Sequence, residues 1–483
     1  MSDSLKEIPI KVEAPRHKGQ QPDDSETVSL YESHTKIYPR AAKGLFNNVR
    51  VLFVIGTQLV FLGLPWLSWN GRQALHFDLI ERKFHLFGLT IWPQDFVYLA
   101  ALLMCCAFGL FTWTTIAGRL WCGYSCPQTV YTEIMLWIEQ WVEGDRNKRI
   151  KLDKSPMSLR KFRIKFTKHA LMIVFSLWTG FTLVGYFTPI RDLVAAAPRF
   201  DYGPWEAFWM FFYAGFTYLL ANFMREQVCK YMCPYARFQS VMFDADTLII
   251  SYDEKRGEPR GARKKGSDPK EQGLGACINC SICVQVCPVG IDIRNGLQYE
   301  CIGCAACIDA CDEVMDKMAY PRGLIRYTTE NALEGKYPEK AIASRLKRPR
   351  VILYTLVLAI VIATAIGSML MRKPFKVDVL RDRASLVRET DAGWLENTYI
   401  IKIINTTEQK QHFRITATGL PGLKVQADRG DIAVAATGNT DVTVHVQADP
   451  QYATKGSHEI RFLIESINNP SLQVEEKSSF IGE

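Results

Sequence analysis

Cysteine is missing from the chain after residue 311, because all 14 cysteines of the 483 residues lie at or before that position. The region after residue 372 also holds no cluster of titratable or metal-ligating residues. A disulfide framework is therefore excluded there, and that part of the chain must be stabilised by an ordinary packed core. The cysteines that do occur gather in a few short motifs, which favours metal binding over disulfide bonding.

Charge is nearly absent from five apolar stretches of about 20 residues, which is long enough to cross the ~30 Å hydrocarbon core of a membrane. The second and fifth contain no charged residue, and the first contains only Arg50. Tryptophans lie near several of their ends, as is typical of membrane interfaces. The stretches are 49–69, 96–116, 170–190, 205–224 and 351–371. They predict an α-helical transmembrane region of about five spans in contact with the lipid bilayer.

Lysine and arginine are distributed unevenly between the loops of these spans. The stretch 117–167 contains ten, whereas the loops 70–94 and 189–204 contain three and two. The positive-inside rule therefore predicts that 117–167 and the insert 225–349 are cytoplasmic and that 372–483 is periplasmic. Residues 1–48 are polar, without the apolar run of a secretory signal, and are expected to form a cytoplasmic tail. The net charge of +8 is then explained by a membrane surface facing anionic lipid, and no nucleic-acid partner is expected.

Two cysteine runs in the large insert share the spacing C-x2-C-x2-C-x3-C. They read "CINCSICVQVCP" and "CIGCAACIDACD". In two-cluster ferredoxins the fourth cysteine of each run binds the other [4Fe–4S] cluster. The first predicted cluster is held by Cys277, Cys280, Cys283 and Cys311, and the second by Cys301, Cys304, Cys307 and Cys287. Zinc knuckles are the alternative, but zinc sites need no third x2 step.

A second motif, C-x3-C-P, occurs twice, at the expected inner ends of the second and fourth spans. The pairs are Cys122 with Cys126 and Cys229 with Cys233. Residues i and i+4 of a helix share a face, and the proline suits either the first turn of a helix or a helix break. Four thiols could meet there, and soft thiolates favour Cu(I), zinc or an iron–sulfur centre. A redox dithiol stays open, and so does plain packing.

Other candidates carry weaker signals. His169, Met224 and Met232 lie near the pairs and are interpreted as packing residues, as are Cys105 and Cys106 in mid-span. No G-x-G-x-x-G follows an expected strand, so a bound nicotinamide or flavin is not indicated. The catalytic residues and the electron donor are not identified by any motif.

The predicted organisation is a multi-domain membrane protein with an inserted α+β ferredoxin-like module and a C-terminal all-β immunoglobulin-like sandwich. Short alternating strands between turn signals after residue 373 support the sandwich. The predicted parts are 1–48 (tail), 49–250 (four spans with the C-x3-C-P pairs), 251–272 (linker), 273–330 (ferredoxin module), 350–372 (fifth span) and 373–483 (sandwich).

With its parts in this order, the chain resembles the cytochrome c oxidase accessory proteins of the CcoG/FixG/RdxA family. The resemblance rests on "CGYSCP", "CKYMCP", the ferredoxin insert, the last span and the sandwich. It implies a bacterial inner-membrane protein that reduces Cu(II) to Cu(I) during assembly of a cbb-type oxidase. The partners expected are copper ions, oxidase assembly factors or a copper-transporting ATPase, an electron donor and a second copy of the chain.

The C-x3-C-P pairs also resemble those of membrane polyferredoxins in nitrate and nitrous-oxide respiration. That resemblance implies a second candidate function, in which the protein takes electrons from quinol and passes them to a partner redox protein. The same cysteine motifs would serve a cupric reductase or a respiratory electron carrier. A purely structural scaffold would leave the eight ferredoxin cysteines unexplained.

Overall fold

Five long helices carry the apolar stretches in the part of the chain that the computed structural model describes, residues 36–482 without 270–271, 383–386, 391 and 470–471. They are α1 (Leu45–Gly63), α2 (Phe96–Ala117), α6 (Leu159–Val184), α8 (Pro204–Tyr218) and α14 (Pro349–Leu370). Short turns extend three of them: η1 (Leu64–Trp66), η2 (Pro93–Asp95) and the π-helical η4 (Leu219–Met224). Each is long and apolar enough to cross a membrane, so the five predicted spans are confirmed.

The third long helix begins about three turns earlier in the chain than hydropathy suggests. The stretch 170–190 was predicted, whereas α6 begins at Leu159, capped by the Ser158 hydroxyl, which accepts a hydrogen bond from the Lys161 backbone N–H. The added residues are basic, and Lys165 and Lys168 pair with buried carboxylates. Such lysines lower the mean hydropathy of this segment, so it is not predicted as part of the apolar span. In the structure their ion pairs stabilise them within the helix.

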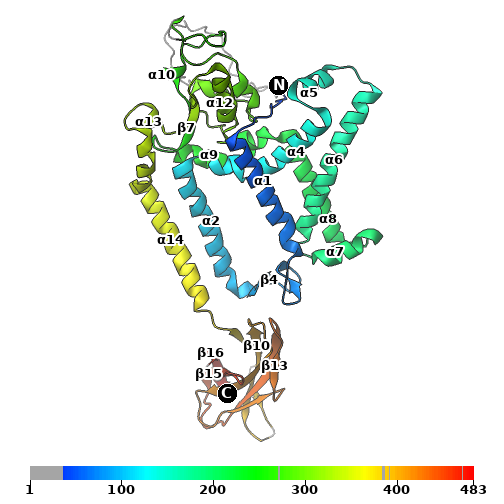
Figure 1. The fold of residues 1–483 in the computed structure, drawn as a ribbon. Coiled ribbons are helices and arrows are strands. Elements are labelled where there is room, and N and C mark those ends of the chain that lie inside the picture. The colour runs from blue at the N-terminus through cyan, green and yellow to red at the C-terminus, as the bar shows by residue number, and fades with distance from the viewer. Residues whose placement is uncertain (1–35, 270–271, 383–386, 391, 470–471, 483) are drawn as a thin grey trace, which may run out of the picture. The chain divides into compact units, whose positions relative to one another are not determined.

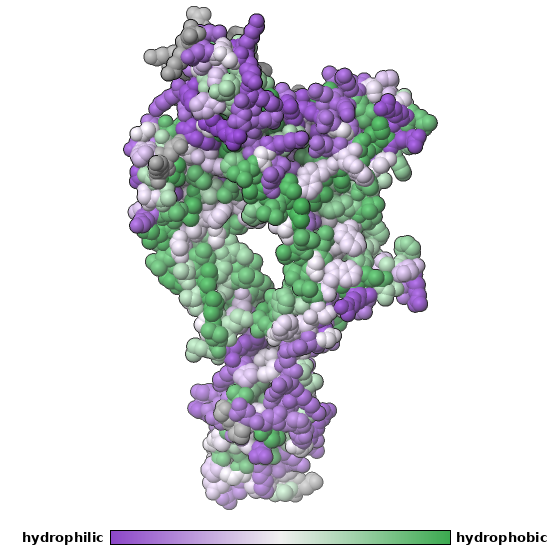
Figure 2. Space-filling model, viewed as in Figure 1, coloured by the Kyte–Doolittle hydropathy of each residue, from purple (hydrophilic) through white to green (hydrophobic). Residues whose placement is uncertain are grey.

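The surfaces of these helices are apolar on their outer sides. Figure 2 shows hydrophobic residues over the long helices and mostly hydrophilic residues over the other domains. Leu52, Leu59, Leu102 and Phe166 are examples of exposed large side chains. Among the long helices, α2 packs against α14 and α6 packs against α8 (Figure 1). Such exposure suits lipid rather than water.

Short elements connect the long helices. Between α1 and α2 lie β1 (Ser68–Trp69), β2 (Arg72–Gln73), β3 (Leu75–Asp78), β4 (Lys83–Leu86) and β5 (Leu89–Ile91). Strands β3, β4 and β5 form an antiparallel sheet. After α2 come α3 (Leu120–Tyr124), α4 (Pro127–Glu143) and α5 (Arg146–Lys154); after α6 come α7 (Ile190–Ala196) and η3 (Ala197–Arg199); after η4 come η5 (Val228–Met232) and α9 (Pro234–Met242).

The cysteine runs lie in a small α+β module. Its elements are β6 (Ile249–Tyr252), α10 (Glu254–Gly257), α11 (Ile282–Val286), η7 (Ile293–Asn295), α12 (Ala306–Met318) and β7 (Ile325–Thr328), followed by α13 (Glu330–Leu333) and η8 (Glu339–Lys347). Strand β6 pairs antiparallel with β7. The region 251–272 was predicted to be a linker, but its first two residues belong to β6, and the Gly261 N–H donates to the carbonyl of Cys277.

Helix α12 of this module caps the first membrane helix. The Asp309 carboxylate accepts hydrogen bonds from the backbone N–H groups of Phe46 (3.2 Å) and Asn47 (2.7 Å). These N–H groups at the start of α1 have no partner within the helix, and a carboxylate there also interacts favourably with the helix dipole. The module is thereby joined to the beginning of α1.

The C-terminal region is a β-sandwich with a continuous apolar core. Its strands are β8 (Phe375–Arg381), β9 (Arg388–Glu389), β10 (Leu395–Asn405), β11 (Gln411–Thr418), β12 (Lys424–Ala427), β13 (Ile432–Val434), β14 (Asn439–Ala448), β15 (Gly456–Ser466) and β16 (Gln473–Gly482). One sheet has the order β12-β14-β10-β8, with β9 on β10, and the other β13-β11-β15-β16. Fully buried Tyr399, Phe413 and Phe462 lie in the core between the sheets. The predicted immunoglobulin-like sandwich is confirmed.

Candidate iron–sulfur and thiol sites

The eight ferredoxin-type cysteines line two neighbouring apolar cavities. Cys277, Cys280, Cys283 and Cys311 line the first. Cys287, Cys301, Cys304 and Cys307 line the second, and Cys283 reaches it as well. The fourth cysteine of each run therefore lies with the first three of the other run. These are the two sets that the spacing predicts, and their binding of iron remains a prediction.

The two cysteine runs share one backbone feature. The residues on both sides of the second cysteine have positive φ: Asn279 and Ser281 in the first run, Gly303 and Ala305 in the second. Left-handed residues turn the chain sharply, which lets three closely spaced thiols face one cavity. Helices α11 and α12 begin directly after Ser281 and Ala305, and each carries the third cysteine of its run.

Burial of these thiols shows what the cavities require chemically. It raises the pKa of Cys283 and Cys287 to about 11 and that of Cys301 and Cys311 to about 12. Thiols whose pKa is raised in this way could be thiolates at neutral pH only if cations compensated their negative charge. The iron ions of a [4Fe–4S] cluster supply such charge, and thiolates are their usual protein ligands. The donor set and its apolar surroundings therefore fit two such clusters.

Each C-x3-C-P motif spans the join between a helical turn and a new helix. Cys122 lies in α3 and Cys229 in η5, whereas Cys126 and Cys233 have extended backbones and are the N-caps of α4 and α9. The following proline is the first residue of the new helix, where its missing N–H costs no hydrogen bond. Of the two roles predicted for the proline, the structure shows the first turn of a helix.

The structure brings the thiols of the two pairs into one neighbourhood. Burial, together with nearby Cys126 and Cys233, raises the pKa of Cys122 to about 11. Burial likewise raises the pKa of Cys229 to about 12, with contributions from Cys126, Cys122 and Cys233. Among the described residues, however, no three His, Cys, Asp or Glu side chains lie close enough to hold one metal ion.

Two polar residues that no motif indicated contact this thiol group. Gln239 of α9, which is fully buried, lies with its amide 3.6 Å from the sulfur of Cys122. Its side-chain oxygen accepts a hydrogen bond from Nε of Arg119 (2.9 Å). Arg119 in turn donates to the backbone carbonyl of Tyr299. One buried arginine thus connects the thiol group to the segment just before Cys301. Gln239 lies six residues beyond Cys233, and its sequence context gives no signal of this role.

The thiol group packs directly on the loop of the second cavity. A Cβ atom added at Gly123 would lie 2.8 Å from Cα of Cys304 and from the carbonyl oxygen of Ile302. Cys122 and Cys229 pack against the same buried cluster as Cys304 and Ile302. Cys229 and Cys304 also line one shared cavity. The C-x3-C-P pairs and the second ferredoxin cavity therefore form one continuous region.

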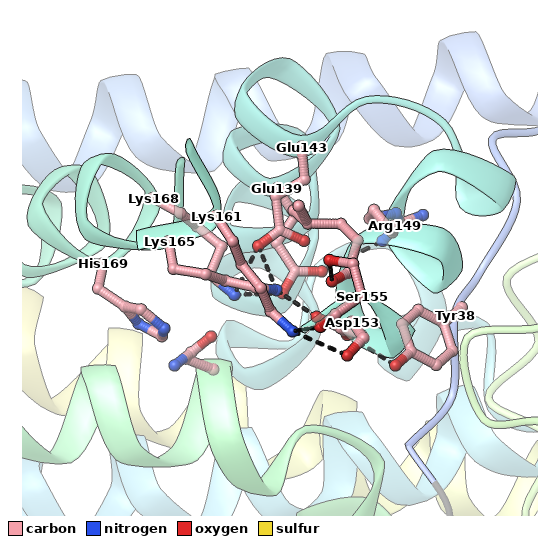
Figure 3. Close-up of polar contacts among 12 residues, drawn as sticks. Tyr38, Glu139, Glu143, Arg149, Asp153, Ser155, Lys161, Lys165, Lys168 and His169 are labelled. Carbon is pink, nitrogen blue, oxygen red and sulfur yellow. Dashed lines mark hydrogen bonds and ion pairs between the residues drawn. The ribbon is translucent and has the colours of Figure 1, made fainter. Parts of the chain in front are cut away.

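Of the weaker candidates, His169 is held by specific contacts. His169 forms a 2.7 Å hydrogen bond with the Tyr218 hydroxyl through Nδ1, and its ring stacks on Phe223. Cys105 and Cys106 lie within α2. Beside His169 is a buried ionic cluster that sequence patterns did not indicate (Figure 3). In it Glu139 pairs with Arg149, Lys168 and Arg225, and Glu143 pairs with Lys165 and Lys168.

Three protein-family models match parts of the chain. A 4Fe-4S dicluster domain matches residues 224–330, and a 4Fe-4S binding domain matches residues 99–149. The IG-like fold at the C-terminal of FixG matches residues 365–483. Iron–sulfur clusters are therefore the cofactors of this chain. The match over 99–149 is notable because Cys122 and Cys126 lie within it.

Three relatives are similar over most of their length. The nitrogen fixation protein FixG of Rhizobium meliloti is 37% identical, with 88% of each chain covered. Protein RdxB of Cereibacter sphaeroides is 38% identical, covering 88% of this chain and 89% of its own. Protein RdxA of the same organism is 36% identical, covering 91% and 96%. The resemblance seen in the sequence is thus confirmed, and the chain belongs to the FixG/RdxA/RdxB family of iron–sulfur membrane proteins.

Proposed function

We propose that this protein is a membrane-bound cupric reductase that supplies Cu(I) for assembly of a cbb-type cytochrome c oxidase. Eight cysteines bind two [4Fe–4S] clusters, and the C-x3-C-P thiols hold the copper substrate. The same proposal puts the ferredoxin module in the cytoplasm and the sandwich in the periplasm of a bacterial inner membrane. The observation that carries it is the contact between Gly123 and Cys304, which joins the thiol group to the second cluster site.

The chemistry assigned to each part follows from its ligands. Reduction of one Cu(II) ion to Cu(I) takes one electron, and a bound [4Fe–4S] cluster supplies electrons singly. Thiolates stabilise Cu(I) over Cu(II), so binding by two of the C-x3-C-P cysteines favours the reduced ion. Arg119 would offset part of the negative charge of those thiolates, and the amide of Gln239 would fix the orientation of Cys122.

The test offers Cu(II) to anaerobic protein whose clusters have been reduced and freed of excess reductant. Cu(I) is followed with a specific chelator, and copper bound per protein is measured separately. In the double variant Cys122→Ser and Cys229→Ser we expect less bound copper and slower reduction, with iron content unchanged. The variant Cys105→Ser, a thiol within α2, is the control. Unchanged copper reduction in the double variant would refute the copper role of the pairs.

The 4Fe-4S match over residues 99–149 favours a second candidate, a respiratory carrier that passes electrons from quinol to a partner redox protein. In that case the C-x3-C-P thiols belong to the electron path and not to a copper site. Loss of iron from the Cys122→Ser, Cys229→Ser variant would support this candidate. So would reduction of the parent protein by a quinol in the absence of copper turnover.

A further inference from the structure

A polar cavity lies where α1 meets the ferredoxin module, and the proposed copper chemistry makes no use of it. Its volume is about 120 Å³, compared with about 20 Å³ for each of the two cysteine cavities. A single water molecule needs roughly 10–15 Å³ measured in this way. The cavity therefore has room for a ligand larger than a few water molecules.

Arginines from three different segments line the cavity. Arg40 precedes α1, Arg50 belongs to α1 and Arg149 belongs to α5. Among the lining residues these three cations face a single carboxylate, that of Glu133. Asn47 and Gln140 add side-chain amide donors, whereas the indole N–H of Trp137 donates to Glu133 (3.0 Å). The lining thus carries a positive charge and is rich in donors, which is the chemistry of an anion site.

The buried arginines do not use all their donors on protein partners. Arg50 donates through Nη2 to Asn47 and pairs with Glu133 at 3.4 Å. Arg149 donates to Glu139 and to the carbonyl of Pro39, while its Nε–H is buried without an acceptor among the described residues. Figure 3 shows Arg149 at the edge of the ionic cluster, beside Glu139. A buried donor without an acceptor is costly, and a ligand oxygen or a water molecule would satisfy it.

The position of the cavity indicates which class of anionic ligand it could bind. The first membrane span begins at Leu45, between Arg40 and Arg50, so the cavity lies at the depth where lipid phosphates meet the protein. Trp137 in its wall is a residue type that prefers this interface. Val286, Pro288 and Ala306 close the cavity from the side of the ferredoxin module, next to Cys287 and Cys307.

We propose that this cavity binds the phosphate group of an anionic ligand, either the head group of an anionic phospholipid or free phosphate. A phosphate held by Arg40, Arg50 and Arg149 would join α1 and α5 to the segment before α1, and the backbone N–H of Arg40 donates to the carbonyl of Gln285 in the ferredoxin module. The ligand would thus fasten the electron-transfer module to the membrane helices. This site is independent of copper binding.

The experiment measures thermal stability of the purified holoprotein with three probes. These are nanodiscs of phosphatidylcholine alone, nanodiscs that also contain phosphatidylglycerol, and detergent-solubilised protein titrated with inorganic phosphate. We expect phosphatidylglycerol or phosphate to raise the melting temperature, because a ligand that binds only the folded state stabilises it. A rise with phosphatidylglycerol alone assigns the site to lipid, and a rise with inorganic phosphate assigns it to the free anion or an exposed head group.

Matched variants connect any stabilisation to this cavity. Arg40→Gln removes an exposed lining charge, and we expect about tenfold weaker binding of the stabilising probe. Glu133→Gln keeps the hydrogen-bonding oxygen but removes the opposing charge, so it should strengthen binding. Lys43→Gln, an equal charge loss on the same segment outside the lining, should leave binding unchanged. Stabilisation by neither probe, or equal effects of Arg40→Gln and Lys43→Gln, would overturn the proposal.

Discussion

Gly123 and Cys304 are in direct backbone contact, although they are far apart in sequence. A side chain at Gly123 would meet Cα and the backbone N of Cys304 within 3 Å, and neither is a flexible group that could move aside. Glycine is therefore required between the two cysteines of the first C-x3-C-P motif for a packing reason. The contact fixes the distance between the thiol group and the second cluster site.

Replacing this glycine should disturb both sites that meet there. We expect Gly123→Ala to destabilise the protein by about 1–3 kcal/mol, because a methyl group is forced into a closely packed contact. Cluster absorbance near 400 nm should fall or shift, and copper reduction should slow. Gly109→Ala is the control, since a Cβ there would meet nothing within 4 Å. Equal melting temperatures for the two variants would show that the contact is loose in solution.

The crossed grouping of the cysteine runs predicts which cluster a single substitution affects. Cys311 lines the cavity of Cys277, Cys280 and Cys283, although it belongs to the other run. Anaerobically purified parent protein should contain about eight iron atoms. Cys311→Ser should lose the signal of the first cluster while the second keeps its spectrum and potential. Iron analysis with electron paramagnetic resonance would measure this, and iron near zero in the parent would refute the assignment.

The buried ionic cluster makes a separate prediction about stability. Glu139 is 2% exposed and compensates Arg149, Lys168 and Arg225, which come from three different segments. Glu139→Gln would leave these cations without their shared carboxylate, at a cost of about 3–5 kcal/mol. Glu313→Gln, in an exposed pair with Lys317, should cost only about 0–1 kcal/mol. Thermal melts of the two variants in the same detergent would make the comparison.

Local sequence patterns predict those structural features that are determined by residues close together in the chain. The exchange of the fourth cysteine between the two runs follows from the spacing of the cysteines alone. The membrane spans follow from the length of the apolar stretches. The sequence does not predict strand β6, because its partner β7 lies more than 70 residues later. It does not predict the early start of α6, because the lysines there are stabilised by Glu139 and Glu143 of α4. Gln239 and the arginine-lined cavity are assembled from segments that only folding brings together.

The orientation of the protein in the membrane can be tested with fusions. Ten lysines and arginines lie in 117–167, and five lie in the two loops predicted to be outside. Arg149 and Lys165 are neutralised by buried carboxylates, but the remaining eight still outnumber five, and acidic residues contribute little to the rule. A reporter that is active only outside the cytoplasm should work at the C-terminus of the full chain and be silent after residue 260.

The opposite result would place the ferredoxin module in an oxidising compartment, where exposed Cys280 and its cluster would be open to oxidation. It would also separate the module from cytoplasmic reductants, so the proposed cupric reductase would need an electron donor outside the cytoplasm.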